Sequence, residues 1–241
     1  MKRFRCTTEI CKNRLRTLRL KHKTVIVPGS GRMGLLLTRR NMLQVGAAAG
    51  LVAAARPAVA ATAFATPKLL QPQISPALLD RARAALVAKS ASIPHQDVIG
   101  ITDFARASRD PRFYLLDVAS GMVTSYQVAH GRGSDPAHSG WLERFSNVPG
   151  SEASSAGAYV TGRIYYGKYG RSLQLTGLDY SNSNAETRAI VIHSAWYAEP
   201  EVAVQHGKLG RSEGCFALSE TNLQYVLYRL GPGRLLYADK V

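Results

Sequence analysis

Apolar positions recur at helical spacing near the start of the body of the chain and at strand-like spacing after it. Residues 75–90, SPALLDRARAALVAKS, begin with a serine followed by a proline, the usual order at a helix start. They predict a helix of about three turns. The clearest predicted β-hairpin pairs residues 113–119 with residues 122–129 across a Ser-Gly turn. The pattern therefore favours one leading helix followed by strands.

The remaining apolar runs are short and are separated by glycine and polar residues. Residues 158–178 predict two strands that meet around residues 167–170, and residues 219–230 predict a helix with a serine cap. Residues 188–193 predict a strand, residues 201–206 predict one or two helical turns, and residues 233–240 predict a final strand. Many short strands with few helices predict a mainly β fold, a β-sandwich or barrel with a few short helices.

A long polar loop, residues 130–157, separates the predicted hairpin from the later strands. Loops of this length are uncommon in compact domains unless they serve a function. Residues 75–241 are numerous enough for one domain with a hydrophobic core, and the proline-containing residues 61–74 are expected to be a linker.

Positive charge is concentrated at the N-terminus. The chain has a formal net charge of +15, but residues 1–60 hold 13 of its 31 Lys and Arg and only one of its 16 acidic residues. Residues 61–241 are therefore close to neutral. The high net charge consequently describes the N-terminal segment and does not indicate a nucleic-acid-binding domain.

The same N-terminal segment has the pattern of an export signal. Arg39 and Arg40 precede a mild apolar run, residues 45–60, which ends in small residues and is too short and too weakly apolar for a comfortable transmembrane span. Paired arginines ahead of such a run resemble a twin-arginine signal. We expect cleavage near Ala60, no membrane anchor afterwards, and Met33 as the true start. A basic arm followed by an alanine-rich helix is the alternative.

Cysteine usage points to one position. Of the three cysteines, Cys6 and Cys11 lie in the segment expected to be absent from the mature protein, which leaves Cys215. A single cysteine in an oxidising compartment cannot form an internal disulfide, so it suggests a reactive thiol or an intermolecular bridge. The alternative is a buried cysteine acting as a small apolar residue, although the polar residues 211–214 make a poor apolar niche.

A reactive cysteine needs a base, a group that orients the base, and donors for a developing oxyanion. His193 closes an apolar run and would be held by a strand, as a base should be held. His206 is nearer to Cys215 in sequence but lies among glycines. The pattern therefore favours His193 as the base.

These residues resemble the L,D-transpeptidase catalytic domain family, in particular its murein L,D-transpeptidase branch. The family pattern is a histidine followed, after a gap, by Ser/Thr-x-Gly-Cys, and here His193 is followed by residues 212–215, SEGC. The similarity extends to residues 144–151, RFSNVPGS, and covers roughly residues 75–240. Ser-x-Gly-Cys alone is a weak motif, whereas these segments together in this order are specific.

The resemblance implies a mainly β periplasmic enzyme that acts on peptidoglycan stem peptides and needs no metal or organic cofactor. It implies that Cys215 is the nucleophile, that His193 is the general base and that the backbone carbonyl of Ser194 orients the imidazole. Backbone N–H groups of Gly214 and Cys215 would bind the oxyanion. The resemblance further implies that the substrate cleft is lined by Arg211, Ser212 and His206. The implied partners are peptidoglycan stem peptides and, for export, the twin-arginine machinery.

Two positions depart from the wider family. Glu213 stands where many members carry histidine, and Ala217 stands where many carry arginine. The first departure removes a second imidazole near the thiol, and the second removes a substrate contact. Both positions agree better with the murein L,D-transpeptidase branch than with the wider family.

Three other interpretations remain open from the sequence. An exported cysteine hydrolase of peptidoglycan, a carboxypeptidase or amidase, would use the same Cys-His chemistry but would produce only hydrolysis. A cell-wall binding module would have no use for the ordered Cys-His pair. A metal site would need ligands from the histidines at positions 130, 138, 193 and 206, and no cluster of Cys or Asp supports it.

Overall fold

The computed structural model describes residues 73–241. The helices are α1 (Pro76–Ala88), α2 (Pro200–His206) and α3 (Glu220–Leu230). Short 3-10 turns are η1 (Ser90–Ser92), η2 (Arg132–Ser134), η3 (Tyr180–Asn182) and η4 (Trp196–Ala198). The strands are β1 (Val98–Asp103), β2 (Phe113–Asp117), β3 (Val123–Tyr126), β4 (Gly157–Gly167), β5 (Gly170–Gly177), β6 (Val191–Ser194), β7 (Phe216–Leu218) and β8 (Leu235–Asp239).

The eight strands form one mixed sheet in the order β3-β2-β1-β8-β4-β5-β6-β7. The pairs β1·β8 and β6·β7 are parallel, and the other pairs are antiparallel. The prediction of a mainly β fold with a few short helices is confirmed. Because β7 lies at one end of the sheet, the residues just before it lie at an edge where loops can reach them.

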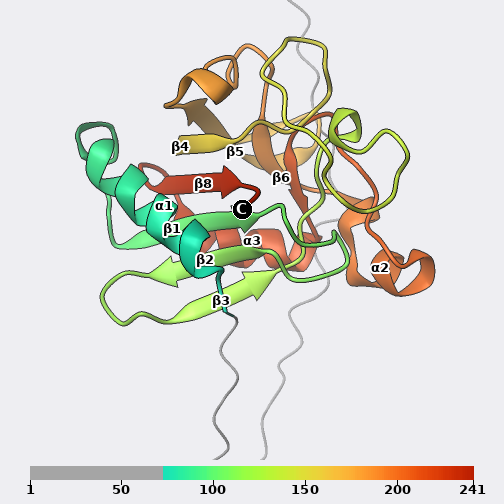
Figure 1. Cartoon of the computed structure of the whole chain (residues 1–241), viewed down its shortest axis with the longest axis horizontal. Helices are drawn as coiled ribbons and strands as arrows, with labels where there is room; N and C mark the ends of the chain where they lie inside the picture. The colour runs from blue at the N-terminus through green and yellow to red at the C-terminus, as the bar shows by residue number, and fades with distance from the viewer. Residues whose placement is uncertain (1–72) are drawn as a thin grey trace, which may run out of the picture. The chain divides into compact units, whose positions relative to one another are not determined.

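Both faces of the central strands are covered, α1 lying on one face and α3 on the other (Figure 1). Successive strand residues point to opposite faces, so Leu235 packs in the cluster of α1 while Leu236 packs in the cluster of α3. From the helices, the buried residues are Leu78, Ala82 and Leu86 of α1, and Leu223, Val226, Leu227 and Leu230 of α3. Apolar burial on two faces therefore holds the centre of the sheet.

Most predicted elements form close to the expected positions. Residues 75–90 form α1, residues 113–129 form the β2–β3 hairpin, and residues 158–178 form most of β4 and β5. The strand expected at residues 188–193 begins only at Val191, because Ala189 adopts a left-handed backbone with φ +52° and ends a turn there. Ser219 caps α3 by accepting a hydrogen bond from the N–H of Asn222.

Two strands, β1 and β7, were not predicted. All six residues of β1 and all three of β7 are buried, so neither shows the alternation of apolar and polar residues by which a half-buried strand is recognised. Within residues 73–241 no helix has the length and apolar character needed to cross a membrane. The export signal at residues 1–60 and nearly all of the linker at residues 61–74 lie outside the described residues.

Candidate active site

Strand pairing brings the predicted base and nucleophile to the same edge of the sheet. In the parallel β6·β7 pair, Ile192 is aligned with Phe216 and His193 with Ala217. Cys215 immediately precedes β7, so continuing this register by one residue places it beside Val191. His193 and Cys215, separated by more than twenty residues of chain, thus lie on neighbouring strands.

His193 is held in one tautomer. Its side chain is 1% exposed, and Nδ1 lies 2.8 Å from the carbonyl oxygen of Ser194, the contact that the resemblance implies. Because a carbonyl can only accept, Nδ1 carries the proton and Nε2 keeps a free lone pair. Burial holds the pKa of His193 below its usual value, and the Ser194 hydrogen bond acts against that shift. The imidazole is therefore neutral near pH 7 and able to accept a proton.

The Cys215 thiol is a protonated, buried group. The residue is 6% exposed, and Sγ donates to the carbonyl oxygen of Ala189 at 3.5 Å. Burial raises the pKa of Cys215 to about 11, while the backbone of Val191 and the charge of Arg188 act in the opposite sense. Within residues 73–241 no hydrogen bond joins this thiol to His193. In this conformation a protonated thiol therefore lies next to the strand that carries a neutral imidazole.

The turn before Cys215 is closed by Ser212. Its hydroxyl donates to the carbonyl oxygen of Cys215 at 2.7 Å and accepts from the N–H of Gly214 at 3.2 Å. Gly214 has φ +113°, and a Cβ there would lie 2.8 Å from the carbonyl oxygen of Ala153, so only glycine fits. In this conformation the Gly214 N–H is engaged inside the turn.

Of the three residues expected to line the cleft, the structure places one at a pocket. His206 lines the hollow described below. Ser212 is 4% exposed, and its backbone bonds to those of His130 and Arg132 in the long loop. Arg211 donates to the carbonyl oxygens of two further loop residues, Asp135 and Pro136. Ser212 and Arg211 thus tie the cysteine turn to the loop.

Arg188 fastens the far end of the same loop. Its guanidinium donates to the carbonyl oxygens of Ser146 and Ala153 and to the hydroxyl groups of Ser151 and Ser155. All four acceptors are neutral, and no carboxylate in residues 73–241 forms an ion pair with Arg188. A positive charge without a counterion therefore lies beside the cysteine turn.

A buried network anchors the start of the loop. The fully buried Arg112 donates to Nδ1 of His130 at 2.7 Å, so Nε2 carries the proton and faces Asp135 at 3.3 Å. Burial, with the Arg112 charge second, lowers the pKa of His130 to about 3, and burial lowers the pKa of Arg112 to about 9. Both ring nitrogens of His130 are thus engaged. No group of three His, Cys, Asp or Glu side chains suited to a metal occurs in residues 73–241.

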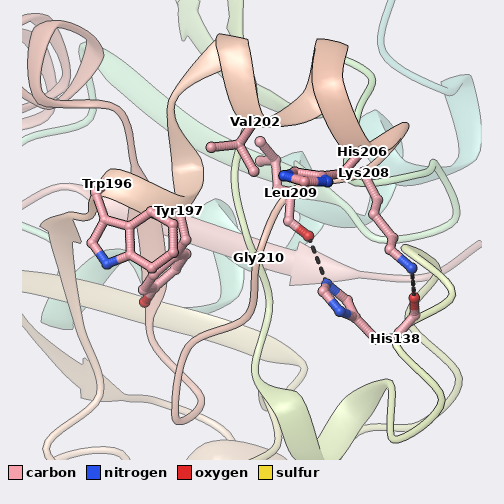
Figure 2. A pocket seen from close by; sticks show the side chains of 8 residues that line it. All are labelled: His138, Trp196, Tyr197, Val202, His206, Lys208, Leu209 and Gly210. Atoms are coloured by element: carbon pink, nitrogen blue, oxygen red, sulfur yellow. Dashed lines mark hydrogen bonds between the residues drawn. The ribbon is translucent and has the colours of Figure 1, made fainter.

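A half-open pocket of about 300 Å³ adjoins the cysteine turn. Figure 2 shows the rings of Trp196 and Tyr197 on one side and His206, Lys208 and Leu209 on the other. Burial raises the pKa of Tyr197, and the charge of Cys215 acts in the same direction, so Tyr197 lies within electrostatic range of the thiol. The pocket combines aromatic surface with a lysine ammonium, a composition suited to an acidic peptide.

A second hollow of about 190 Å³ lies next to the thiol's acceptor. It is lined by Ala189 and Val191, and its polar groups come from Arg163, Gln174 and Glu186. This second hollow therefore borders residues that adjoin Cys215. Neither hollow follows from the sequence patterns, because the walls of each come from separate segments of the chain.

An aromatic neighbour of His193 does not follow from the sequence patterns. The ring of Tyr169 is stacked on that of His193, with 4.5 Å between centroids and 22° between planes. Tyr169 lies in the turn between β4 and β5, where no local pattern distinguishes it from the other tyrosines of the hairpin. Only the β5·β6 pairing, in which Ser172 is aligned with His193, brings that turn to the base.

Comparison with known proteins gives a family and a set of similar structures. The model of the L,D-transpeptidase catalytic domain family matches residues 70–238. No curated protein matches the chain. Among solved structures, an L,D-transpeptidase from Mycobacterium smegmatis is 13% identical with a TM-score of 0.36, over 59% of this chain and 58% of that one. L,D-transpeptidase 3 from Mycobacterium tuberculosis with a faropenem-derived adduct is 13% identical with a TM-score of 0.36, over 60% of each chain. The helical cell shape determining protein Pgp2 from Campylobacter jejuni is 16% identical with a TM-score of 0.37, over 59% of this chain and 47% of that one.

Proposed function

The chain belongs to the L,D-transpeptidase catalytic domain family, and from that premise we propose that it is an exported cysteine L,D-transpeptidase of peptidoglycan. Cys215 attacks the carbonyl at the L-centre of the third stem residue, the terminal D-Ala leaves, and an amine of a second stem takes the acyl group. The observation that carries the proposal is the β6·β7 register, which brings His193, with its free Nε2, beside the strand that follows Cys215.

The resting geometry favours general-base catalysis over a stored ion pair. The thiol, protonated at neutral pH, leaves the carbonyl oxygen of Ala189 and turns toward His193. As the C–S bond forms, Nε2 takes the thiol proton, and the resulting imidazolium is stabilised through Nδ1 by the carbonyl of Ser194. The imidazolium then gives its proton to the departing amine of D-Ala as the C–N bond breaks.

The second half of the reaction uses the same groups in reverse. His193 takes a proton from the incoming amine as that amine attacks the thioester, and the proton returns to the sulfur when the C–S bond breaks. With water as the acceptor, the product is a trimmed tripeptide stem instead of a 3–3 cross-link. The oxyanion is stabilised by backbone N–H groups of the cysteine turn, which requires the Gly214 N–H to exchange its Ser212 contact for the substrate.

We assign two hollows to the two peptide stems: the larger one, lined by Gly210 near the cysteine turn, and the smaller one, lined by Ala189 and Val191 next to Cys215. The larger one offers Lys208 and His206 to acidic groups of one stem, with Trp196 and Tyr197 packing against it (Figure 2). The smaller one offers both a cation and an anion, Arg163 and Glu186, to the other.

The decisive experiment is muropeptide analysis. Purified protein is incubated with tetrapeptide-rich peptidoglycan, and products are separated by liquid chromatography and identified by mass. We expect release of D-Ala together with 3–3 dimers, and neither product with Cys215→Ser, in which a nearly isosteric hydroxyl is a far poorer nucleophile. Tripeptides without dimers would identify a carboxypeptidase. A Cys215→Ser protein that still released D-Ala would contradict the mechanism.

We further propose that the enzyme works in the periplasm after twin-arginine export. Support comes from Arg39 and Arg40 ahead of the apolar run that ends near Ala60. Replacing both arginines by lysine keeps the charge and should leave the precursor in the cytoplasm, visible by fractionation and immunoblotting. Mature protein from wild-type cells should begin near Ala61 by N-terminal sequencing. Normal processing of the double-lysine variant would contradict this route.

A further inference from the structure

The turn between β4 and β5 carries an aromatic residue directly to the base. The turn consists of Lys168 and Tyr169, flanked by the paired glycines Gly167 and Gly170. Gly170, directly after the two turn residues, has φ +74°, a left-handed backbone that glycine adopts readily and that lets the chain enter β5. The turn is therefore tight, and it presents Tyr169 at a defined place beyond the end of the hairpin.

Tyr169 contacts both His193 and the turn that precedes Cys215. Its ring is stacked on the imidazole of His193, with centroids 4.5 Å apart. Its hydroxyl donates to Oε2 of Glu213 at 3.3 Å, two residues before Cys215. Glu213 also faces Arg132 of the long loop at 3.7 Å. One side chain thus links the hairpin, the base and the cysteine turn.

We infer that Tyr169 is a positioning residue for the His193 imidazole and that Glu213 holds Tyr169 in place through its hydroxyl. The inference rests on the proposed function for the role of His193 as the base. The inference also assigns a structural role to Glu213, which stands where many family members carry histidine.

Two independent constraints fix a planar ring better than one. The hydrogen bond from Nδ1 to Ser194 fixes one edge of the imidazole but permits the ring to tilt about that bond. The stacked phenol ring of Tyr169 lies along the face and opposes the tilt. Together the two contacts aim Nε2, the atom that must receive the thiol proton. Misdirection of a catalytic group by a small angle is enough to slow a reaction.

Tyr169 also shields the base from water. It is 37% exposed while the ring beneath it is 1% exposed, so the phenol covers the solvent side of the imidazole. Since burial is the main cause of the lowered pKa of His193, removal of the phenol should raise that pKa toward the usual histidine value. A residue that merely stabilised the hairpin would not change the titration of His193.

Other titratable groups surround the site and must stay constant in a test. Lys168 extends from the same turn, with its ammonium 5.1 Å from the centre of the Tyr169 ring. The cysteine turn contributes Glu213 and Cys215, and η4 contributes Tyr197. The strands on either side of His193 align the uncharged Ser172 and Ala217 with it. A substitution of Tyr169 alone removes none of these charges.

The test is a titration of His193 in the full chain. Protein labelled with ¹³C-histidine is titrated by NMR, and the His193 signal is assigned by its loss in His193→Gln. In Tyr169→Leu we expect the pKa of His193 to rise by about half a unit or more. Tyr169→Phe keeps the stacked ring but loses the hydrogen bond to Glu213, so it should raise the pKa much less, by about as much as Glu213→Ala. Tyr166→Leu is the matched control, because Tyr166 is an 82% exposed residue of the same hairpin.

Activity provides a second reading. The acid limb of kcat/KM should move to higher pH in Tyr169→Leu by the same amount as the NMR titration, and kcat should fall roughly tenfold to a hundredfold. Glu213→Ala should show a smaller change in the same direction. An unchanged His193 titration in Tyr169→Leu, or an equal shift in Tyr166→Leu, would overturn the inference. If the wild-type chain forms no cross-links but the titrations shift as expected, the proposed function fails and the positioning of His193 stands.

Discussion

The centre of the sheet and its cysteine edge are built from different contacts. The cysteine edge comprises β6, β7 and the loop 130–156. At the centre, β1 and β8 are packed between α1 and α3 by apolar side chains on both faces. At the cysteine edge, a long loop is held by hydrogen bonds. Arg188 and Arg211 donate to its carbonyl oxygens, and the backbone of Ser212 pairs with its backbone. The centre therefore provides stability, while the edge provides directed polar groups at some cost in stability.

The same contrast governs titratable groups. Three buried titratable side chains gather at the edge, His130, His193 and Cys215, and burial shifts each pKa toward the neutral form. The centre holds buried titratable groups as well, such as Asp103 of β1, but they are scattered among apolar residues. Perturbed titratable groups that gather in one region mark a functional site more often than a structural one. Substitutions at the two regions should consequently separate stability from activity.

The largest expected effect separates the regions directly. Leu236→Ala at the centre removes a fully buried side chain and should lower the free energy of unfolding by about 2–5 kcal/mol while leaving the activity per folded molecule near wild type. His193→Gln at the edge removes the proposed general base and should reduce kcat by about 10²–10⁴-fold, with a stability change of about 1 kcal/mol. Urea unfolding and D-Ala release measure the two quantities.

Each variant is the control for the other. The comparison between centre and edge would be wrong if His193→Gln unfolded as readily as Leu236→Ala, or if Leu236→Ala lost activity while still folded. Both variants should be assayed at a urea concentration well below the unfolding transition of the less stable one, so that folded protein dominates each sample.

Acid should destabilise the protein mainly through the edge. His130 binds a proton near pH 6.5 when unfolded but only at about 3 when folded, so between these values the unfolded state binds more protons. Stability is therefore present above pH 6.5 and is lost as the pH falls toward 3, by about 1.4 kcal/mol per pH unit for one proton. The lowered pKa of Asp135 acts in the same direction at the acid end.

Urea unfolding at pH 7 and pH 5 measures this slope. His130→Gln removes the titrating imidazole and should flatten the slope, at the cost of lower stability at pH 7. Leu236→Ala serves as the reference, since its stability should fall with pH as steeply as that of the wild type. Equal slopes for all three proteins would assign the acid sensitivity elsewhere.

The predictability of the two regions from sequence differs for a physical reason. Helix α1 and the β2–β3 hairpin follow from local patterns, because caps, turns and periodicity depend on residues close together in the sequence. Cys215, His193 and Ser194 were chosen as site residues from their chemistry and the family motif, and the register brings them together. Tyr169 and Arg188 could not be found in this way, because each reaches the site through contacts between strands or loops distant in sequence.

Ser212 and Arg211 illustrate a second limit. Their polarity and their place in the motif predicted contact with substrate, yet both face the loop 130–156 in this conformation. A polar residue near a nucleophile can bind substrate or close a turn, and sequence does not distinguish the two uses. The choice depends on which oxygen and nitrogen atoms the fold brings within hydrogen-bond distance.

Arg188 should affect the thiol through its charge. Arg188→Gln removes a cation that favours the thiolate and should raise the pKa of Cys215 further, slowing alkylation by iodoacetamide at pH 8 by roughly threefold to tenfold. Arg188→Lys keeps the charge but loses most of the four hydrogen bonds to the loop. If Cys215 in Arg188→Lys is alkylated at close to the wild-type rate, the effect belongs to the charge. If both variants are slowed equally, the effect belongs to the loop.

Glu213 should act in the opposite direction and with the smallest effect. Its negative charge contributes to the raised pKa of Cys215, so Glu213→Gln should speed alkylation of the thiol at pH 8. Gln keeps an oxygen that can accept from the Tyr169 hydroxyl, which limits the change to the charge. The Glu213 side chain is 54% exposed, so solvent screens the interaction and the increase should stay below about threefold. The acceleration should fade as NaCl rises to roughly 0.5 M, because salt shortens the range of an exposed charge.

Glu152→Gln is the matched control: this carboxylate also pairs with Arg132, but it does not contribute to the pKa shift of the Cys215 thiol. A slower reaction in Glu213→Gln, or an equal acceleration in Glu152→Gln, would contradict a direct effect of Glu213 on the nucleophile.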